Sequence, residues 1–116
     1  MLSDAFITDL KEGLLNVISN TGLLGRWQVL NNSPKAVGDT GHNREGLQYV
    51  MRQLLSEKYN QLHIVFGVVK DKDINTIADV LPKKAIYYFC KPDIPRGMDA
   101  QKLQAQLNKY NLNGEV

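Results

Sequence analysis

Apolar residues follow two different spacings along the chain. Helical spacing predicts helices over residues 4–19, 43–58 and 99–110, and a shorter helix over 73–81 that Pro82 ends. Short apolar runs predict strands over 26–30, 35–38, 62–69 and 85–90, and another strand beginning near 113–116. Because strands and helices alternate, we expect an α/β fold with right-handed crossovers and a mostly parallel sheet.

Length and charge narrow the possible classes of protein. A chain of 116 residues is long enough for one domain with a single core. Its net charge is only +2 and its basic residues are scattered, so a nucleic-acid partner is not expected. No apolar run is long enough to span a membrane. The single cysteine, Cys90, is expected to be a core thiol and fits a reducing cytoplasm.

A polar turn follows the strand predicted over residues 35–38. It contains the acid Asp39, the hydroxyl Thr40, the imidazole His42 and the carboxamide Asn43. Ligands of α/β proteins usually bind at the carboxyl ends of strands, and Asp39 could orient His42 as a general base. Asp39 and Asn43 could equally well do no more than cap the following helix. Local chemistry alone leaves both interpretations open.

Two more strand ends carry charged side chains. Asp71, Lys72 and Asp73 follow the strand over 62–69, and Arg96 lies in the loop after the next strand. If all these strands belong to one parallel sheet, the charges share an edge with Asp39 and form one crevice. A solvated turn with Asp73 as a helix cap is the alternative for the acidic group.

Several familiar site motifs are missing from the sequence. It contains neither a P-loop nor the glycine fingerprint of dinucleotide-binding folds. Apart from His42, the chain has only His63, which falls inside a predicted strand, so a two-histidine metal site is not expected. Any contact with a nucleotide would therefore be made by an accessory surface.

Five short motifs together resemble a known family. They are Gly25-Arg26-Trp27, the turn Asp39-Thr40-Gly41-His42-Asn43, Phe66-Gly67, Asp71-Lys72-Asp73 and Pro95-Arg96. Their order and spacing resemble the C-terminal domain of the folylpolyglutamate synthase and dihydrofolate synthase group of the Mur ligase family. The resemblance spans about residues 12–107. It departs from the family pattern at Thr40 and Gly41, where Gly and Ala are common, and at Arg44, where Pro is frequent.

The resemblance implies an ATP-dependent amide ligase. Family members phosphorylate a carboxylate, here that of a folate, to an acyl phosphate, which the amine of L-glutamate then attacks. The resemblance assigns residues 1–116 to one glutamate ligase domain, Rossmann-like with three layers and truncated at its C-terminal end. The ATPase domain, with the P-loop and the Mg²⁺ ligands, would be the N-terminal domain and is absent from this chain. The C-terminal domain alone is then expected to be inactive.

The resemblance also implies roles for individual residues. Arg26 matches an arginine that reaches the phosphates and ribose of ATP, and Asp39 matches an acid that accepts hydrogen bonds from the ribose hydroxyls. His42 matches a histidine near the phosphates or the incoming glutamate, where a positive group would aid phosphoryl transfer. Asn43 is carried over as a further nucleotide contact.

The resemblance leaves other assignments open. Lys72 and Arg96 could bind the glutamate carboxylates or only the interface with the ATPase domain. The full protein could also be bifunctional, with dihydrofolate synthase activity. Two alternatives remain: a Mur-type ligase with another acceptor, such as a muropeptide, and a non-catalytic Rossmann-like binding module.

Overall fold

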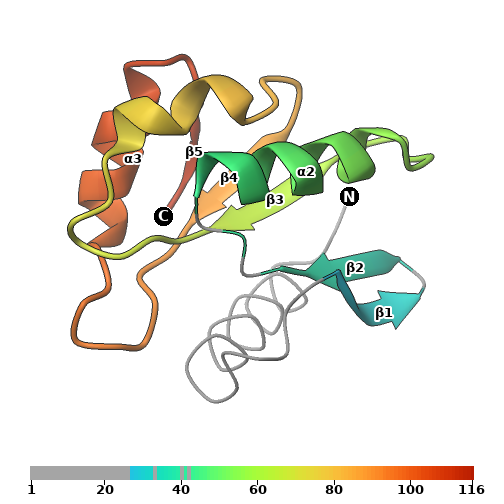
Figure 1. Ribbon diagram of the computed structural model, residues 1–116, viewed down its shortest axis with the longest axis horizontal. Helices are drawn as coiled ribbons and strands as arrows, with labels where there is room; N and C mark the ends of the chain where they lie inside the picture. The colour runs from blue at the N-terminus through green and yellow to red at the C-terminus, as the bar shows by residue number, and fades with distance from the viewer. Residues whose placement is uncertain (1–26, 33, 40, 42) are drawn as a thin grey trace. The chain divides into compact units, whose positions relative to one another are not determined.

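The computed structural model describes residues 27–32, 34–39, 41 and 43–116. The chain divides into two compact units between Thr40 and Gly41 (Figure 1). The helix predicted over residues 4–19 lies outside the described residues. The assignment of residues 1–116 to a single domain stays a prediction.

The first unit contains a β-hairpin. Strand β1 (Gln28–Asn32) pairs antiparallel with β2 (Lys35–Gly38), and Asn32 lies opposite Lys35. Both strands were expected from the sequence, but the prediction that they belong to the mostly parallel sheet is wrong. Only two residues separate them, which suffices for a hairpin and is far too short for a parallel crossover.

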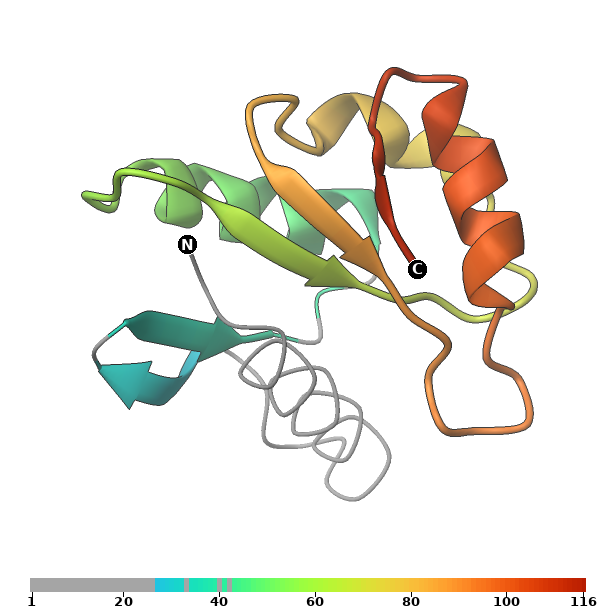
Figure 2. The same cartoon turned by 180° about the vertical axis from the view of Figure 1, so that it is seen from behind.

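The second unit contains the parallel sheet. Its strands are β3 (His63–Phe66), β4 (Ile86–Phe89) and β5 (Gly114–Glu115), in that order across the sheet. Helix α2 (Arg44–Leu55) lies across one face, and α3 (Ala100–Asn108) runs beside β5 (Figures 1 and 2). The α/β class, the parallel pairing and the strand near 113–116 are confirmed.

The segment between β3 and β4 differs from its prediction. The single helix expected over residues 73–81 is instead two 3-10 turns, η1 (Ile74–Thr76) and η2 (Ala78–Val80). Asp73 accepts a hydrogen bond from the Asn75 amide, and the Thr76 hydroxyl donates to the Asp73 carbonyl. Such local bonds compete with α-helical hydrogen bonding, so the apolar spacing predicted burial correctly but the wrong kind of helix.

The core of the second unit contains residues of α2, α3, the two 3-10 turns, β3 and β4. Leu103 and Leu107 of α3 are fully buried, and the Tyr87 hydroxyl donates to the Pro82 carbonyl at 2.6 Å. The other buried apolar residues of this cluster are Leu47, Met51, Leu62, Ile64, Ile74, Ile77, Ala78, Leu81, Phe89, Met98 and Leu112. Among the described residues, no helix is long and apolar enough to cross a membrane.

Candidate functional site

Asp39 follows β2, and its side chain binds the backbone of the residue that precedes β1. Its Oδ2 atom accepts a hydrogen bond from the backbone amide of Trp27 at 2.8 Å. Trp27 has a φ of 45°, in the left-handed region that non-glycine residues rarely adopt. The carboxylate therefore stabilises an unusual backbone at the residue next to Arg26. Arg26 and His42 themselves lie outside the described residues, so their predicted roles stay predictions.

Asn43 caps α2, as the capping interpretation proposed. Its Oδ1 atom accepts a hydrogen bond from the Gly46 amide at 2.7 Å, and its carbonyl accepts one from Leu47. The cap satisfies amides that the first helical turn leaves without partners. Contact between Asn43 and a nucleotide stays a prediction.

Arg44 is a residue whose contacts the sequence did not predict. Its guanidinium binds both carboxylate oxygens of Asp79, at 2.5 and 2.7 Å, and also donates to the Thr76 carbonyl at 3.0 Å. The pair ties the first turn of α2 to the 3-10 turns that precede β4. The sequence contained one indication of this contact. A cation in the first turn of a helix opposes the helix dipole, which suggests an acidic partner.

We expect the Arg44–Asp79 pair to be energetically coupled. Arg44→Asp or Asp79→Arg alone should each lower the melting temperature, and the double variant should recover part of the loss. The guanidinium holds the pKa of Asp79 below its usual range. Stabilisation by such a carboxylate is present above its unfolded pKa, about 4, and is lost as pH falls through the lower folded value. Thermal denaturation from pH 7 to pH 2 measures the coupling.

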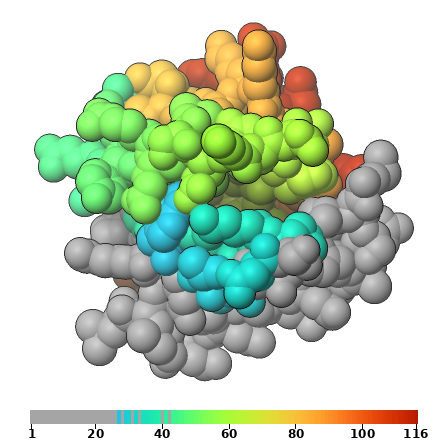
Figure 3. Space-filling view, turned by 90° about the vertical axis from the view of Figure 1, so that its right-hand side faces the viewer, coloured from blue at the N-terminus to red at the C-terminus, as the bar shows by residue number. Residues whose placement is uncertain are grey.

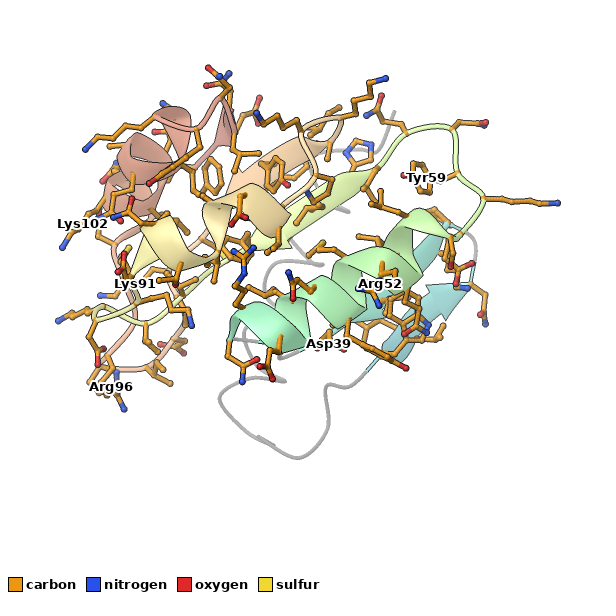
Figure 4. All side chains as sticks on the ribbon, turned by 45° about the horizontal axis from the view of Figure 1, so that its top comes forward. Asp39, Arg52, Tyr59, Lys91, Arg96 and Lys102 are labelled. Atoms are coloured by element: carbon orange, nitrogen blue, oxygen red, sulfur yellow. The ribbon has the colours of Figure 1, made fainter. Side chains whose placement is uncertain are left out.

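Arg52→Asp is the matched control for this cycle. Arg52 lies on the same helix and is exposed (Figure 4). The surface of α2 is green in Figure 3. The effects of Arg52→Asp and Asp79→Arg on the melting temperature should simply add. Equal coupling for both arginines, or coupling unchanged at pH 2, would contradict the assignment.

Asp71 and Arg96 meet at the carboxyl end of the parallel sheet. The Arg96 Nη2 atom lies 3.2 and 3.4 Å from the two carboxylate oxygens of Asp71. A hydrogen bond from its own backbone amide, and then the Arg96 guanidinium, hold the pKa of Asp71 below its usual range. The predicted meeting of these two strand ends is confirmed. The prediction that Asp39 shares their sheet edge is wrong, because β2 belongs to the separate hairpin.

Lys72 borders a different feature from the Asp71–Arg96 pair. It lines an open hollow of about 330 Å³ between η1 and the last turn of α3. The Tyr110 hydroxyl donates to Asn75 at the wall of this hollow. The remaining lining residues are Asp73, Ile74, Gln106 and Lys109. The structure therefore brings Arg96 to Asp71 and gives Lys72 other neighbours.

His63 and Cys90 each contact a residue of the neighbouring strand. The His63 Nδ1 atom lies 3.0 Å from the Tyr88 hydroxyl, the two rings stack, and burial lowers the pKa of His63. Cys90 is half-buried and its thiol donates to the Phe66 carbonyl. Within the part of the chain that the structure describes, no three acidic, histidine or cysteine side chains are grouped to hold a metal ion.

Comparisons with known proteins agree in sequence and in fold. The family model "Mur ligase, glutamate ligase domain" matches residues 25–116. A probable bifunctional folylpolyglutamate synthase/dihydropteroate synthase of Haloferax volcanii is 32% identical over 100 residues, which are 86% of this chain and 12% of that protein.

Solved structures of longer chains match as well. Escherichia coli FolC in complex with DHPP and ADP is 29% identical, with a TM-score of 0.63 over 80% of this chain and 22% of that one. A bifunctional folylpolyglutamate synthase/dihydrofolate synthase with Mn, AMPPNP and L-glutamate bound is 28% identical, with a TM-score of 0.62 over 72% and 21% of the two chains. The chain thus spans about a fifth of these relatives, and it belongs to the Mur ligase family as a glutamate ligase domain.

Proposed function

We propose that this chain is the C-terminal domain of an ATP-dependent ligase that adds L-glutamate to a folate carboxylate through an acyl phosphate. The observation that carries the proposal is the match over residues 25–116 to the glutamate ligase domain. The relatives named folylpolyglutamate synthase favour a folate over another acceptor. Dihydrofolate synthase activity of the same enzyme is part of the proposal, since several relatives carry both names.

In this proposal the nucleotide contacts are those that the family resemblance implies. Arg26 binds the phosphates and ribose, Asp39 accepts hydrogen bonds from the ribose hydroxyls, and Asn43 makes a further contact with the nucleotide. His42 acts near the phosphates as the catalytic residue. The Asp39–Trp27 hydrogen bond supports this arrangement, because it fixes the backbone beside Arg26 relative to the Asp39 carboxylate.

Arg96 and Lys72 bind the carboxylates of glutamate in this proposal. Arg96 projects from the loop after β4, and its side chain is 71% exposed (Figure 4). A guanidinium suits a carboxylate because its planar donors match the two oxygens. Lys72 offers a second cation on the neighbouring loop, although its place beside the η1–α3 hollow fits an interface role equally well.

The remaining parts of the reaction fall to other segments of the full enzyme. ATP binds with Mg²⁺, and one relative was crystallised with Mn and AMPPNP. The described residues offer no grouped metal ligands, so we place the metal site in an N-terminal ATPase domain, together with the P-loop. This ATPase domain is the proposed partner, the chain alone is inactive, and the enzyme is cytoplasmic.

Reconstitution tests the proposal. The chain is mixed with, or fused to, the ATPase domain of a relative, and glutamate-dependent ADP release is measured in the presence of a folate. We expect release only with both halves, and severe loss in Arg26→Ala and His42→Ala variants. Wild-type turnover in both variants would overturn the site assignment, and micromolar ATP binding by the chain alone in calorimetry would overturn its accessory role.

A further inference from the structure

The Asp71–Arg96 pair is open and only partly formed. Both side chains are 71% exposed, and one guanidinium nitrogen faces both carboxylate oxygens at 3.2 and 3.4 Å. A full fork would use two nitrogens at shorter distances, as Arg44 does with Asp79 at 2.5 and 2.7 Å. Exposed pairs of this kind contribute little to stability, so another carboxylate can displace Asp71 easily.

The backbone beneath the pair is firmly held. The backbone amide of Lys70 donates to the Arg96 carbonyl at 2.6 Å, and that of Met98 donates to the Val68 carbonyl at 2.8 Å. Between them, Val69 forms an antiparallel bridge with Gly97. These bonds join residues 68–70 of the loop after β3 to residues 96–98 of the loop after β4, directly beside the pair. The guanidinium can therefore leave Asp71 by side-chain rotation alone, without any movement of the loops.

From this geometry we propose that Asp71 is an internal competitor for Arg96 and sets the affinity of the site for the carboxylate of the amino-acid substrate. The inference rests on the proposed role of Arg96 in binding glutamate. In the unliganded domain the Asp71 carboxylate occupies the position that a substrate carboxylate takes. Binding exchanges one carboxylate for the other and uses both guanidinium nitrogens. Asp71 thereby selects against anions that cannot offer a two-oxygen contact.

The test measures KM for L-glutamate in the reconstituted ligase. Asp71→Asn keeps the size of the side chain but weakens its hold on Arg96, and should lower KM about twofold to fivefold, within the range of exposed ion pairs. The kcat value should change less than about twofold, since the reacting groups are untouched. Asp93→Asn is the matched control: Asp93 is an exposed acid on the same loop as Arg96, and its removal should leave KM unchanged.

The Arg96→Gln variant tests the role of Arg96 in binding glutamate separately from the competitor role of Asp71. It should raise KM for L-glutamate, and adding Asp71→Asn to it should bring no further decrease, because Asp71 acts through Arg96. An unchanged KM in Arg96→Gln would overturn the proposed role of Arg96, and the competitor role with it. A raised KM in Arg96→Gln together with an unchanged or raised KM in Asp71→Asn would overturn the competitor role alone.

Discussion

Replacing Asp39 with asparagine is expected to lower kcat/KM for ATP about thirtyfold in the reconstituted ligase. The change removes the negative charge that accepts hydrogen bonds from the ribose hydroxyls in the proposed site. Losing one hydrogen bond to a charged group costs about 1.5–3 kcal/mol, which corresponds to about 10-fold to 150-fold. Initial rates of ADP release over a range of ATP concentrations measure the effect.

Asp39→Ala provides the comparison that separates binding from folding. Asparagine retains a side-chain oxygen for the Trp27 amide, whereas alanine leaves that amide without the acceptor that it has at 2.8 Å. We therefore expect the melting temperature to fall in Asp39→Ala but to remain near wild type in Asp39→Asn. An Asp39→Asn enzyme with wild-type kcat/KM for ATP would show that the carboxylate serves the hairpin and not the nucleotide.

Gly97→Ala is expected to destabilise the second unit by about 2 kcal/mol, the middle of the range for overpacked sites. A Cβ atom at residue 97 would lie 2.4 Å from the Pro92 carbonyl oxygen and 3.2 Å from that of Ile94. Both are backbone atoms, so the loop itself must shift, and Arg96 with it. Thermal denaturation of the chain should show a melting temperature lower by about 10 °C.

Asp93→Ala is the control for the glycine substitution. It alters an exposed residue of the same loop and should leave the melting temperature within about 2 °C of wild type, as is usual for surface sites. If the loop shift also moves Arg96, Gly97→Ala should raise KM for L-glutamate at temperatures where the protein remains folded. A melting temperature equal to that of the control would contradict the close packing at residue 97.

The sequence predicted the elements of the second unit well because their apolar spacing is strong. Helix α2 and strands β3 and β4 lie within the ranges expected from it, shortened at their ends. Strand β3 stops at Phe66 because Val68 and Val69 bond to the loop after β4 instead. The meeting of Asp71 and Arg96 was also predictable, since carboxyl ends of neighbouring parallel strands share an edge.

Other features could not be predicted from local patterns. The Arg44–Asp79 pair joins residues 35 positions apart, and no periodicity specifies such a partner. The hairpin is a different case, because the short turn between the strands predicted over residues 26–30 and 35–38 already indicated antiparallel pairing. Because β2 pairs with β1 in this hairpin, the sheet edge predicted for Asp39 is wrong.

Mass analysis of the folate product tests the central claim most directly. A folate is incubated with ATP, Mg²⁺, L-glutamate and the ATPase domain of a relative, with and without this chain. We expect a folate heavier by one glutamyl residue, formed only when the chain is present. Equal product without the chain, or no product from the combined halves when the relative's own C-terminal domain restores activity, would contradict it.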